Sequence, residues 1–304
     1  FGPVGAALLA ACCTCAAGLH AQARSPLGEI KLMPRIDRRF ATVKIQIFYE
    51  SMCNDSKTFF NTSVREVWED PDLNPFLDID LFPAGHTKVI PAAEVPEGYW
   101  YWHPEKRNDS WIYICEHGES ECAGNQIMAC AIKTMEIPEL YVPYLICMAE
   151  RNLRGRYTDY DHNFMHLPEK SAFRCCHKMH ISVWPIHDCF VTDRNSTTFM
   201  EHRIAAASEN LDPPMTYVPY VTVNGVRVDI NNTNALKATI CESLADVAPL
   251  TCRDTLARRQ AWREGRLQSE GREIGKCVKH NDSGLRPDAP VDSNGIHDPE
   301  LGFR

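Results

Sequence analysis

Fourteen cysteines in a chain of 304 residues constrain this sequence more than any other feature. Cytosolic proteins keep their thiols reduced, whereas proteins exported to an oxidising compartment use cysteines in disulfide bridges. The composition is otherwise that of a globular protein, with 44% hydrophobic and 24% charged residues. The net charge of −8 argues against a general role in binding nucleic acid. We therefore expect an exported domain held together by disulfides.

The N-terminal sequence agrees with export. Residues 4–19 form an uncharged apolar run, and Ala21-Gln22-Ala23 follows with the small-x-small pattern of a signal-peptide cleavage site. Because the chain opens on Phe1, we expect the basic start of the signal to precede it. A buried helix or a membrane anchor is the alternative, but the run is short for a bilayer span. We predict a signal peptide over residues 1–23 and no membrane span in the mature protein.

Six Asn-x-Ser/Thr sequons also fit a secreted glycoprotein. They begin at Asn54, Asn61, Asn108, Asn195, Asn231 and Asn281. Asn54 directly follows Cys53, so a glycan there would obstruct protein substrates of that cysteine. Occupancy of Asn54 therefore separates a catalytic from a non-catalytic role.

The cysteine count of the mature chain is odd. Removing Cys12, Cys13 and Cys15 with the signal leaves 14 − 3 = 11, so one cysteine is a free thiol or forms an intermolecular bridge. We predict from its local sequence that Cys53 is this one. The ten expected in intramolecular bridges, with their pairing left open, are Cys115, Cys122, Cys130, Cys147, Cys175, Cys176, Cys189, Cys241, Cys252 and Cys277.

The first part of the domain has the pattern of a strand–helix–strand unit. Residues 42–49 alternate and then become fully apolar, as a largely buried strand does. From Ser56 the period changes to that of a helix, which Pro71 ends. The apolar stripe of this helix comprises Phe60, Val64, Val67 and Trp68. Residues 76–82 form a second strand, and the short connections indicate a βαβ unit.

The rest of the chain divides into three regions. Residues 115–211 contain seven cysteines, with helical patterns at 122–136 and 139–152. Residues 217–230 indicate a hairpin with an Asn-Gly turn, and a helix follows at about 233–246. We expect an α/β protein with a thioredoxin-like sheet over residues 42–252 and a helical, disulfide-rich insertion. Residues 253–304 are predicted to be a polar, disordered tail whose first part is compatible with an exposed helix.

Cys53 lies where the first strand gives way to the helix. The first turn of a helix presents unpaired N–H groups and a partial positive charge, which stabilise a thiolate. Ser56, one turn along, stands where a Cys-x-x-Cys site has its second cysteine, and its hydroxyl is placed to donate to the same sulfur. A buried structural cysteine is the alternative, but the helix start, the export and the odd count together favour a reactive thiol.

Pro219 precedes the first strand of the predicted hairpin. A proline at the start of a strand also has a purely structural explanation. In thioredoxin-like folds, however, this position is a cis-proline that faces the catalytic cysteine. The backbone of the residue before it, here Val218, is then exposed for pairing with a substrate chain.

The stretch CEHGESECAGNQIMAC, residues 115–130, resembles the signature Cys-Gln-His-Gly-x-x-Glu-Cys-x-x-Asn-x-x-x-x-Cys of the gamma-interferon-inducible lysosomal thiol reductase family. Glu116 departs from it by replacing the Gln. The segments FYESMCNDS and YVPYVTVNG resemble the family's Cys-x-x-Cys and proline segments, so the similarity spans about residues 42–252. It implies a thioredoxin-like fold that reduces protein disulfides in endosomes and lysosomes.

The signature also has a competing interpretation as a zinc site. Cys115, His117, Cys122 and Cys130 lack the short Cys-x₂₋₄-Cys pairs of common structural zinc sites. Disulfides are favoured in an exported chain, and His117 is then a local structural residue. We expect neither a metal nor an organic cofactor.

Ser56 cannot act as a resolving thiol. We therefore expect a thiol–disulfide oxidoreductase with Cys53 as its sole nucleophile, Ser56 tuning the thiolate and Val218-Pro219 binding the substrate backbone. Its partners would be disulfide-containing proteins, and an external small thiol would release the mixed disulfide. The expected location is the secretory pathway, either endolysosomal or extracellular. The alternatives are a non-catalytic glycoprotein that binds partners or forms stable mixed disulfides, and a structural module in which Cys53 is paired.

Overall fold

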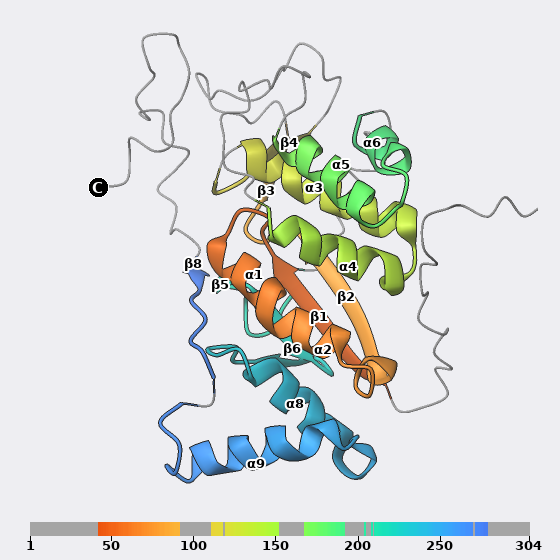
Figure 1. Cartoon of the computed structure of the whole chain (residues 1–304). Helices are drawn as coiled ribbons and strands as arrows, with labels where there is room; N and C mark the ends of the chain where they lie inside the picture. The colour runs from red at the N-terminus through yellow and green to blue at the C-terminus, as the bar shows by residue number, and fades with distance from the viewer. Residues whose placement is uncertain are drawn as a thin grey trace, which may run out of the picture. The chain divides into compact units, whose positions relative to one another are not determined.

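A four-stranded sheet lies at the centre of the protein, in the order β2-β1-β6-β7. In this computed structural model, β1 (Val43–Tyr49) and β2 (Leu77–Pro83) are parallel, with Val43 opposite Leu77 and Tyr49 opposite Pro83. β6 (Tyr220–Val223) runs antiparallel to β1, and β7 (Val226–Val228) runs antiparallel to β6. Both strands of the predicted βαβ unit are therefore confirmed, and they lie side by side in the sheet (Figure 1).

The structure describes residues 42–91, 111–117, 119–151, 167–191, 204, 208, 210–269 and 271–278. All of them belong to one compact unit, residues 35–304. The predicted signal peptide, residues 1–23, and Cys12, Cys13 and Cys15 lie outside the described residues. So do the sequons at Asn108, Asn195 and Asn281.

One helical stretch connects β1 to β2. It comprises α1 (Asn54–Phe59), a π-helical turn η1 (Phe60–Val64) and α2 (Arg65–Glu69), and a 3₁₀ turn η2 (Asn74–Phe76) leads into β2. The predicted apolar stripe of this helix is buried in the core beside the strand residues Val43, Ile45 and Ile47. The core therefore sits between β1 and the helix that follows Cys53, and it holds the start of that helix in place.

The β6–β7 hairpin closes the sheet as predicted. Asn224 and Gly225 both have positive φ, 51° and 77°, which is the conformation that a type I′ turn requires. The Asn224 side-chain oxygen accepts a hydrogen bond from Lys44 N at 2.9 Å, and the Asn224 backbone N–H donates to Lys44 O at 2.7 Å. The turn is thus tied to the start of β1.

The predicted insertion is helical and rich in disulfides. It contains α3 (Glu119–Met135), α4 (Pro138–Ala149), α5 (Leu167–Lys178) and α6 (Trp184–Val191). Cys130–Cys189 links α3 to α6, and Cys147–Cys175 links α4 to α5. A short hairpin of β3 (Lys88–Pro91) and β4 (Trp111–Ile114) precedes these helices. No helix among the described residues is long and apolar enough to cross a membrane.

Ordered structure continues beyond residue 252, where the sequence predicted a tail. α8 (Ala235–Leu244) and the 3₁₀ turn η5 (Ala245–Val247) lead to α9 (Thr251–Arg263), and Cys241–Cys252 joins the two helices. Further along, β8 (Cys277–Val278) pairs antiparallel with β5 (Tyr217–Val218) (Figure 1). The predicted disordered tail over 253–304 is therefore wrong for the described residues up to 278. Its polar composition hid one buried anchor, Ile274, whose side chain is 3% exposed.

Candidate active site

Cys53 lies at the junction between β1 and α1, and its position follows from both elements. It is the N-cap of α1, and its Sγ accepts a hydrogen bond from the backbone N–H of Ser56 at 3.3 Å. The residue is completely buried. An N-cap side chain that accepts from the first turn satisfies one of the unpaired helix donors. The same donor stabilises a negative charge on sulfur once the cysteine is reduced.

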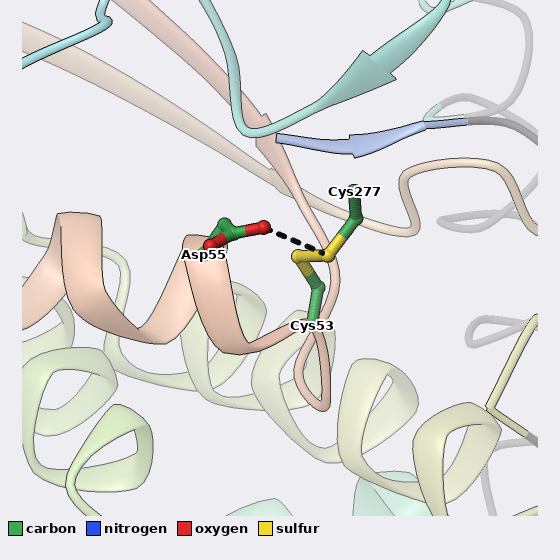
Figure 2. Close-up of side chains that lie close together, drawn as sticks. All are labelled: Cys53, Asp55 and Cys277. Atoms are coloured by element: carbon green, nitrogen blue, oxygen red, sulfur yellow. Dashed lines mark hydrogen bonds between the residues drawn. A yellow bond between two sulfur atoms is a disulfide. The ribbon is translucent and has the colours of Figure 1, made fainter. Parts of the chain in front are cut away.

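Cys53 is paired in the structure, contrary to the prediction from its local sequence. It forms a disulfide with Cys277, 224 residues later in the chain, with the two Cα atoms 6.3 Å apart (Figure 2). The prediction was wrong because the local sequence of Cys53 carries no sign that a distant polar segment returns to the same helix start.

The unpaired cysteine among the described residues is Cys176, which was predicted to be in a bridge. Cys175, its neighbour on α5, bonds to Cys147, and adjacent positions on a helix face different directions. Cys176 points into the core instead, and burial raises the pKa of its thiol to about 11. It is therefore a poor nucleophile. The other predicted bridge cysteines are paired, with Cys115 bonded to Cys122.

Ser56 contacts the Cys53 sulfur in a different way from the one expected. Its backbone N–H, not its hydroxyl, donates to Sγ. The hydroxyl is buried and accepts a hydrogen bond from Glu50 N at 3.4 Å. The side chain thus holds the end of β1 against the first turn of α1, while the backbone of the same residue contacts the sulfur.

The predicted backbone edge lies against this disulfide. The Val218–Pro219 peptide bond is cis, and the Val218 carbonyl oxygen is 3.9 Å from Cys53 Sγ. β8 occupies the edge of β5, with Cys277 opposite Val218 and Val278 opposite Tyr217. An extended cysteine-containing strand therefore already sits on Val218 while its sulfur is joined to Cys53.

Asp55 provides a carboxyl group beside the second sulfur. Its Oδ2 lies 3.6 Å from Cys277 Sγ (Figure 2). Partial burial raises the pKa of this carboxyl above its ordinary value. Asp55 is thus placed to exchange a proton with Cys277 when the disulfide opens.

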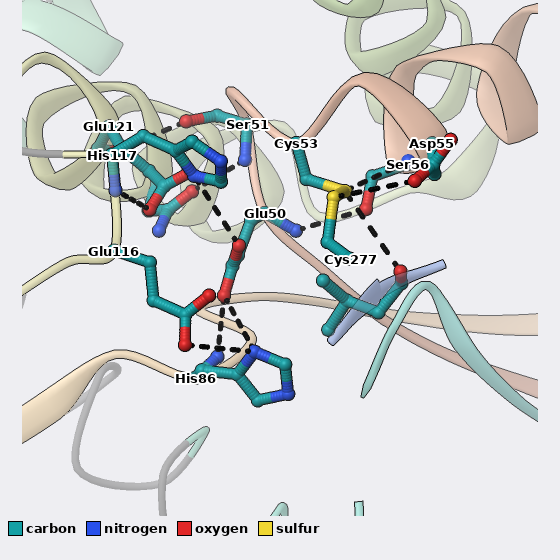
Figure 3. The surroundings of a disulfide bond; sticks show 12 residues. Glu50, Ser51, Cys53, Asp55, Ser56, His86, Glu116, His117, Glu121 and Cys277 are labelled. Carbon is teal, nitrogen blue, oxygen red and sulfur yellow. Dashed lines mark hydrogen bonds and ion pairs between the residues drawn. A yellow bond between two sulfur atoms is a disulfide. The ribbon is translucent and has the colours of Figure 1, made fainter. Parts of the chain in front are cut away.

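A cluster of acidic and histidine side chains lies on the other side of Cys53 (Figure 3). Glu50, at the end of β1, is 1% exposed and accepts a hydrogen bond from His86 N at 2.8 Å. Burial, and next the negative charge of Glu121, raise the pKa of Glu50 well above its ordinary value. His86 Nδ1 lies 3.4 Å from Glu50 Oε1 and 3.5 Å from Glu116 Oε1. A carboxyl group whose pKa is raised therefore lies three residues before the candidate nucleophile.

His117 belongs to the same cluster. Its Nδ1 lies 2.6 Å from Glu121 Oε2 and 3.7 Å from Glu50 Oε2. Two groups, each formed by Glu50, one histidine and one further glutamate, bring their ligand atoms within 4.8 Å of one another. Oxygen and imidazole donors of this kind would suit a divalent ion such as Zn²⁺. The cysteines of the alternative zinc set are instead in disulfides.

Comparison with known proteins shows what these residues are similar to. Residues 44–179 match the sequence model described as Gamma interferon inducible lysosomal thiol reductase (GILT). Over this segment the chain is similar to the GILT family. The matched segment contains Cys53, Ser56 and the acidic and histidine cluster, whereas Val218, Pro219 and Cys277 lie beyond its end. GILT is by name a family of thiol–disulfide oxidoreductases.

Three relatives illustrate the similarity. The chain is 27% identical over 203 residues to the gamma-interferon-responsive lysosomal thiol protein of Arabidopsis thaliana. This alignment covers 66% of this chain and 70% of that protein. It is 25% identical over 229 residues to the thiol reductase of Carassius auratus, covering 71% and 74%. The Mus musculus thiol reductase is 29% identical over 188 residues, 60% of each chain. Among solved structures, reduced DsbA from Mycobacterium tuberculosis has a TM-score of 0.45 at 13% identity, over 75% of this chain and 95% of that chain.

The GILT signature at 115–130 contributes structure and charge to this site. Cys115 and Cys122 close the start of α3, and Glu121 and Asn125 face the residues after β1. Asn125 Oδ1 accepts from Ser51 N at 2.9 Å, which ties α3 to the segment that leads into Cys53. Glu116, the one departure from the GILT signature, adds a carboxyl near His86.

Sequence reasoning missed Glu50, Asp55, His86 and Cys277 as site residues. Glu50 and Asp55 flank Cys53. A charged residue directly after an apolar strand is unusual, and this pattern could have identified Glu50 as a site residue. His86 and Cys277 carry no local signal, because only the fold brings them to Cys53. Of the sequon residues that are described, Asn54 and Asn231 are exposed and Asn61 is half-buried. Their glycosylation stays a prediction.

Proposed function

We propose that this protein exchanges thiols and disulfides with protein substrates, and that Cys53 is its nucleophile. One observation carries the proposal: Cys53 is bonded to a cysteine on an extended strand that pairs with Val218. A substrate cysteine in an extended peptide would occupy the same place and present its sulfur to Cys53. The match of residues 44–179 to the GILT model supports the same chemistry.

The reaction begins with the reduced enzyme. The Cys53 thiolate attacks one sulfur of a substrate disulfide, a new S–S bond forms, and the other substrate sulfur leaves as a thiolate. The Ser56 N–H, 3.3 Å from Sγ, stabilises the attacking charge. The Ser56 side chain cannot break the mixed disulfide, since a hydroxyl group does not exchange with disulfides in neutral or acidic water.

We further propose that an external small thiol is the final reductant. Two such thiols supply the two electrons of each cycle and leave as their own disulfide, and no metal or organic cofactor takes part. The substrates are disulfide-containing proteins of the endolysosomal or secretory pathway. The predicted signal peptide and sequons support that location, and the three relatives described above are all named as lysosomal proteins.

A second candidate is a non-catalytic glycoprotein on the same scaffold. The complete burial of Cys53 and its bond to Cys277 favour this alternative, because a permanently bridged sulfur cannot attack. The two candidates differ in whether the Cys53–Cys277 bond opens under mild reduction.

The test compares the prereduced wild-type protein with Cys53→Ser in the reduction of a denatured, disulfide-bonded protein at pH 5 and pH 7. We expect turnover in the wild type and none above the external thiol alone in Cys53→Ser. Cys176→Ser is the matched control, since Cys176 is unpaired and buried, and it should retain full turnover. Equal activity in the wild type and Cys53→Ser would exclude Cys53 as the nucleophile.

A further inference from the structure

We propose that Cys277 is the resolving cysteine of this enzyme, so that Cys53 and Cys277 together form a dithiol site in place of a Cys-x-x-Cys pair. This inference rests on the proposed function, because a resolving thiol is needed only if Cys53 attacks. It replaces the expected single-cysteine cycle with one in which the second thiol comes from a segment 224 residues away.

The segment before Cys277 is anchored independently of the disulfide. Ile274 is buried in the core, and its N–H donates to Asn231 O at 3.0 Å. One residue earlier, Glu273 forms a β-bridge with Asn232, and Arg272 O accepts from Thr233 N at 2.8 Å. Only two residues separate this anchor from Cys277. When the disulfide opens, Cys277 therefore stays within reach of Cys53 at a high effective concentration.

β8 and an incoming substrate compete for one edge. β8 contributes only two residues to its pairing with β5, so little backbone hydrogen bonding opposes its release once the S–S bond is broken. Lys276 adds surface contacts, with Nζ 2.8 Å from Asp229 Oδ1 and 4.6 Å from the Tyr217 ring centroid. A substrate strand can thus displace β8 from Val218, and the return of β8 expels the product strand.

The two sulfurs have environments suited to different roles. Cys53 Sγ faces a helix N–H, which favours its thiolate as attacking and leaving group. Cys277 Sγ lies beside the Asp55 carboxyl group, which is placed to take the proton of the Cys277 thiol as that sulfur attacks. Cys277 is also the less buried of the two, so an external thiol reaches it first.

The full cycle balances with these groups. After Cys53 has attacked the substrate, the Cys277 thiol gives its proton to Asp55 and its sulfur attacks Cys53 Sγ. The bond between Cys53 and the substrate breaks, and the second substrate sulfur leaves as a thiolate that takes the proton from Asp55. Two external thiols then reduce the Cys53–Cys277 bond and are oxidised to one disulfide.

The decisive experiment uses Cys277→Ser in the full chain. Prereduced protein is mixed with a denatured disulfide-bonded protein at about 0.1 mM external thiol, and mixed disulfides are counted on non-reducing gels. In a single turnover, an effective concentration of about 1 mM for a short tether predicts about tenfold slower release of the substrate from the Cys53 adduct in Cys277→Ser, so that the adduct accumulates. Cys176→Ser should behave as the wild type. Added external thiol should restore the release rate of Cys277→Ser.

The outcomes separate this inference from the proposed function. If Cys277→Ser forms no adduct and Cys53→Ser has wild-type turnover, the proposed function fails. If Cys277→Ser forms the adduct but releases the substrate as fast as the wild type or faster in a single turnover, Cys53 attacks and Cys277 does not resolve. That second result would make β8 an inhibitory strap.

A measurement on the unmodified protein covers the case in which Cys277→Ser does not fold. The wild type is equilibrated in glutathione buffers of increasing reducing strength, and free thiols are alkylated and mapped by mass spectrometry. A resolving pair should open while the bridges at Cys130, Cys147 and Cys241 remain closed. If the Cys53–Cys277 bond survives in buffers that already open those bridges, it is structural and the inference is wrong.

Discussion

The contact between Cys53 and the backbone of Ser56 gives position 56 two separable functions. Ser56→Pro removes both the N–H that contacts Sγ and the hydroxyl, whereas Ser56→Ala removes only the hydroxyl. Proline is tolerated in the first turn of a helix. Both substitutions delete the sequon at Asn54 and the hydroxyl that accepts from Glu50 N. A difference between the two variants therefore reports only the loss of the Ser56 N–H.

We expect Ser56→Pro to raise the pKa of the reduced Cys53 thiol and Ser56→Ala to leave it nearly unchanged. A hydrogen bond to a charged group contributes about 1.5–3 kcal/mol, and 1.36 kcal/mol corresponds to one pKa unit, so the rise should be about one unit or more. The rate of Cys53 alkylation against pH measures it. Equal shifts in the two variants would mean that the hydroxyl, not the N–H, sets the reactivity.

Cys176 offers a second prediction at the residue scale. With a pKa of about 11, its thiol is ionised to about one part in a thousand at pH 8. Its burial also excludes an alkylating reagent. We expect no labelling of Cys176 in the native protein and complete labelling in denaturant, followed by mass spectrometry. Rapid native labelling of Cys176 would show that α5 opens in solution.

At the scale of elements, the close contact between the β8 segment and α1 can be tested by substitution. A methyl group at position 275 would lie 2.8 Å from Asp55 Cγ, too close for an unchanged closed form. Gly275→Ala should therefore make the Cys53–Cys277 bond easier to reduce, by about two- to fivefold in the equilibrium constant for contact strain of about 0.5–1 kcal/mol.

Asp55→Ala removes the group that the methyl would meet and provides the matched control. If the crowding is specific, Gly275→Ala should have little effect in the Asp55→Ala background, which a double-mutant cycle measures in glutathione buffers. Additive effects of the two substitutions would show that position 275 acts through another contact.

The elements differ in how far the sequence specified them. Strand β1, the helix after Cys53 and the β6–β7 hairpin were predictable because their signals are local: alternation, an apolar stripe and an Asn-Gly turn. β8 was not, because two residues between Lys276 and Lys279 form no periodic pattern and their partner strand lies far earlier in the chain, at Tyr217–Val218. The site residues follow the same rule: those with a local signal were predicted, and those brought in by the fold were not. Cys53 does contact Ser56 and Val218, and the bond between Val218 and Pro219 is cis, whereas Cys277 required the tertiary structure.

At the scale of the whole molecule, four of the five disulfides among the described residues divide into two kinds by what they connect, and the fifth, Cys115–Cys122, is local, with a sequence separation of 7. Cys130–Cys189, Cys147–Cys175 and Cys241–Cys252 join neighbouring helices through largely buried sulfurs. Cys53–Cys277 instead joins the helix start at the centre of the sheet to a segment near the end of the described chain. A bridge between elements that also pack together supports the fold, whereas a bridge to a two-residue strand leaves most of the fold intact when it opens.

Glu50 connects three parts of the molecule and should make the stability of the fold depend on pH. It follows β1 and is faced by His86 after β2 and by Glu116, His117 and Glu121 around the start of α3. Burial raises its pKa in the folded state, so the folded protein binds this proton more tightly than the unfolded chain does. Stability should then fall as pH rises from the unfolded value of about 4.5 toward the folded one.

Glu50→Gln keeps a neutral side chain at every pH and preserves the acceptor for His86 N. We expect it to melt at a higher temperature than the wild type at pH 7, by about 2–4 °C for each kcal/mol relieved, and to converge with the wild type near pH 4.5. Glu136→Gln, at an exposed position after α3, is the matched control and should follow the wild-type curve. Thermal unfolding between pH 4.5 and 8 decides the matter. Parallel curves for the wild type and Glu50→Gln would mean that Glu50 is ionised in the folded protein. Protonated His86 and His117, or a bound cation, would then stabilise its charge. Any stabilisation of the protein by acid would have to come from another group.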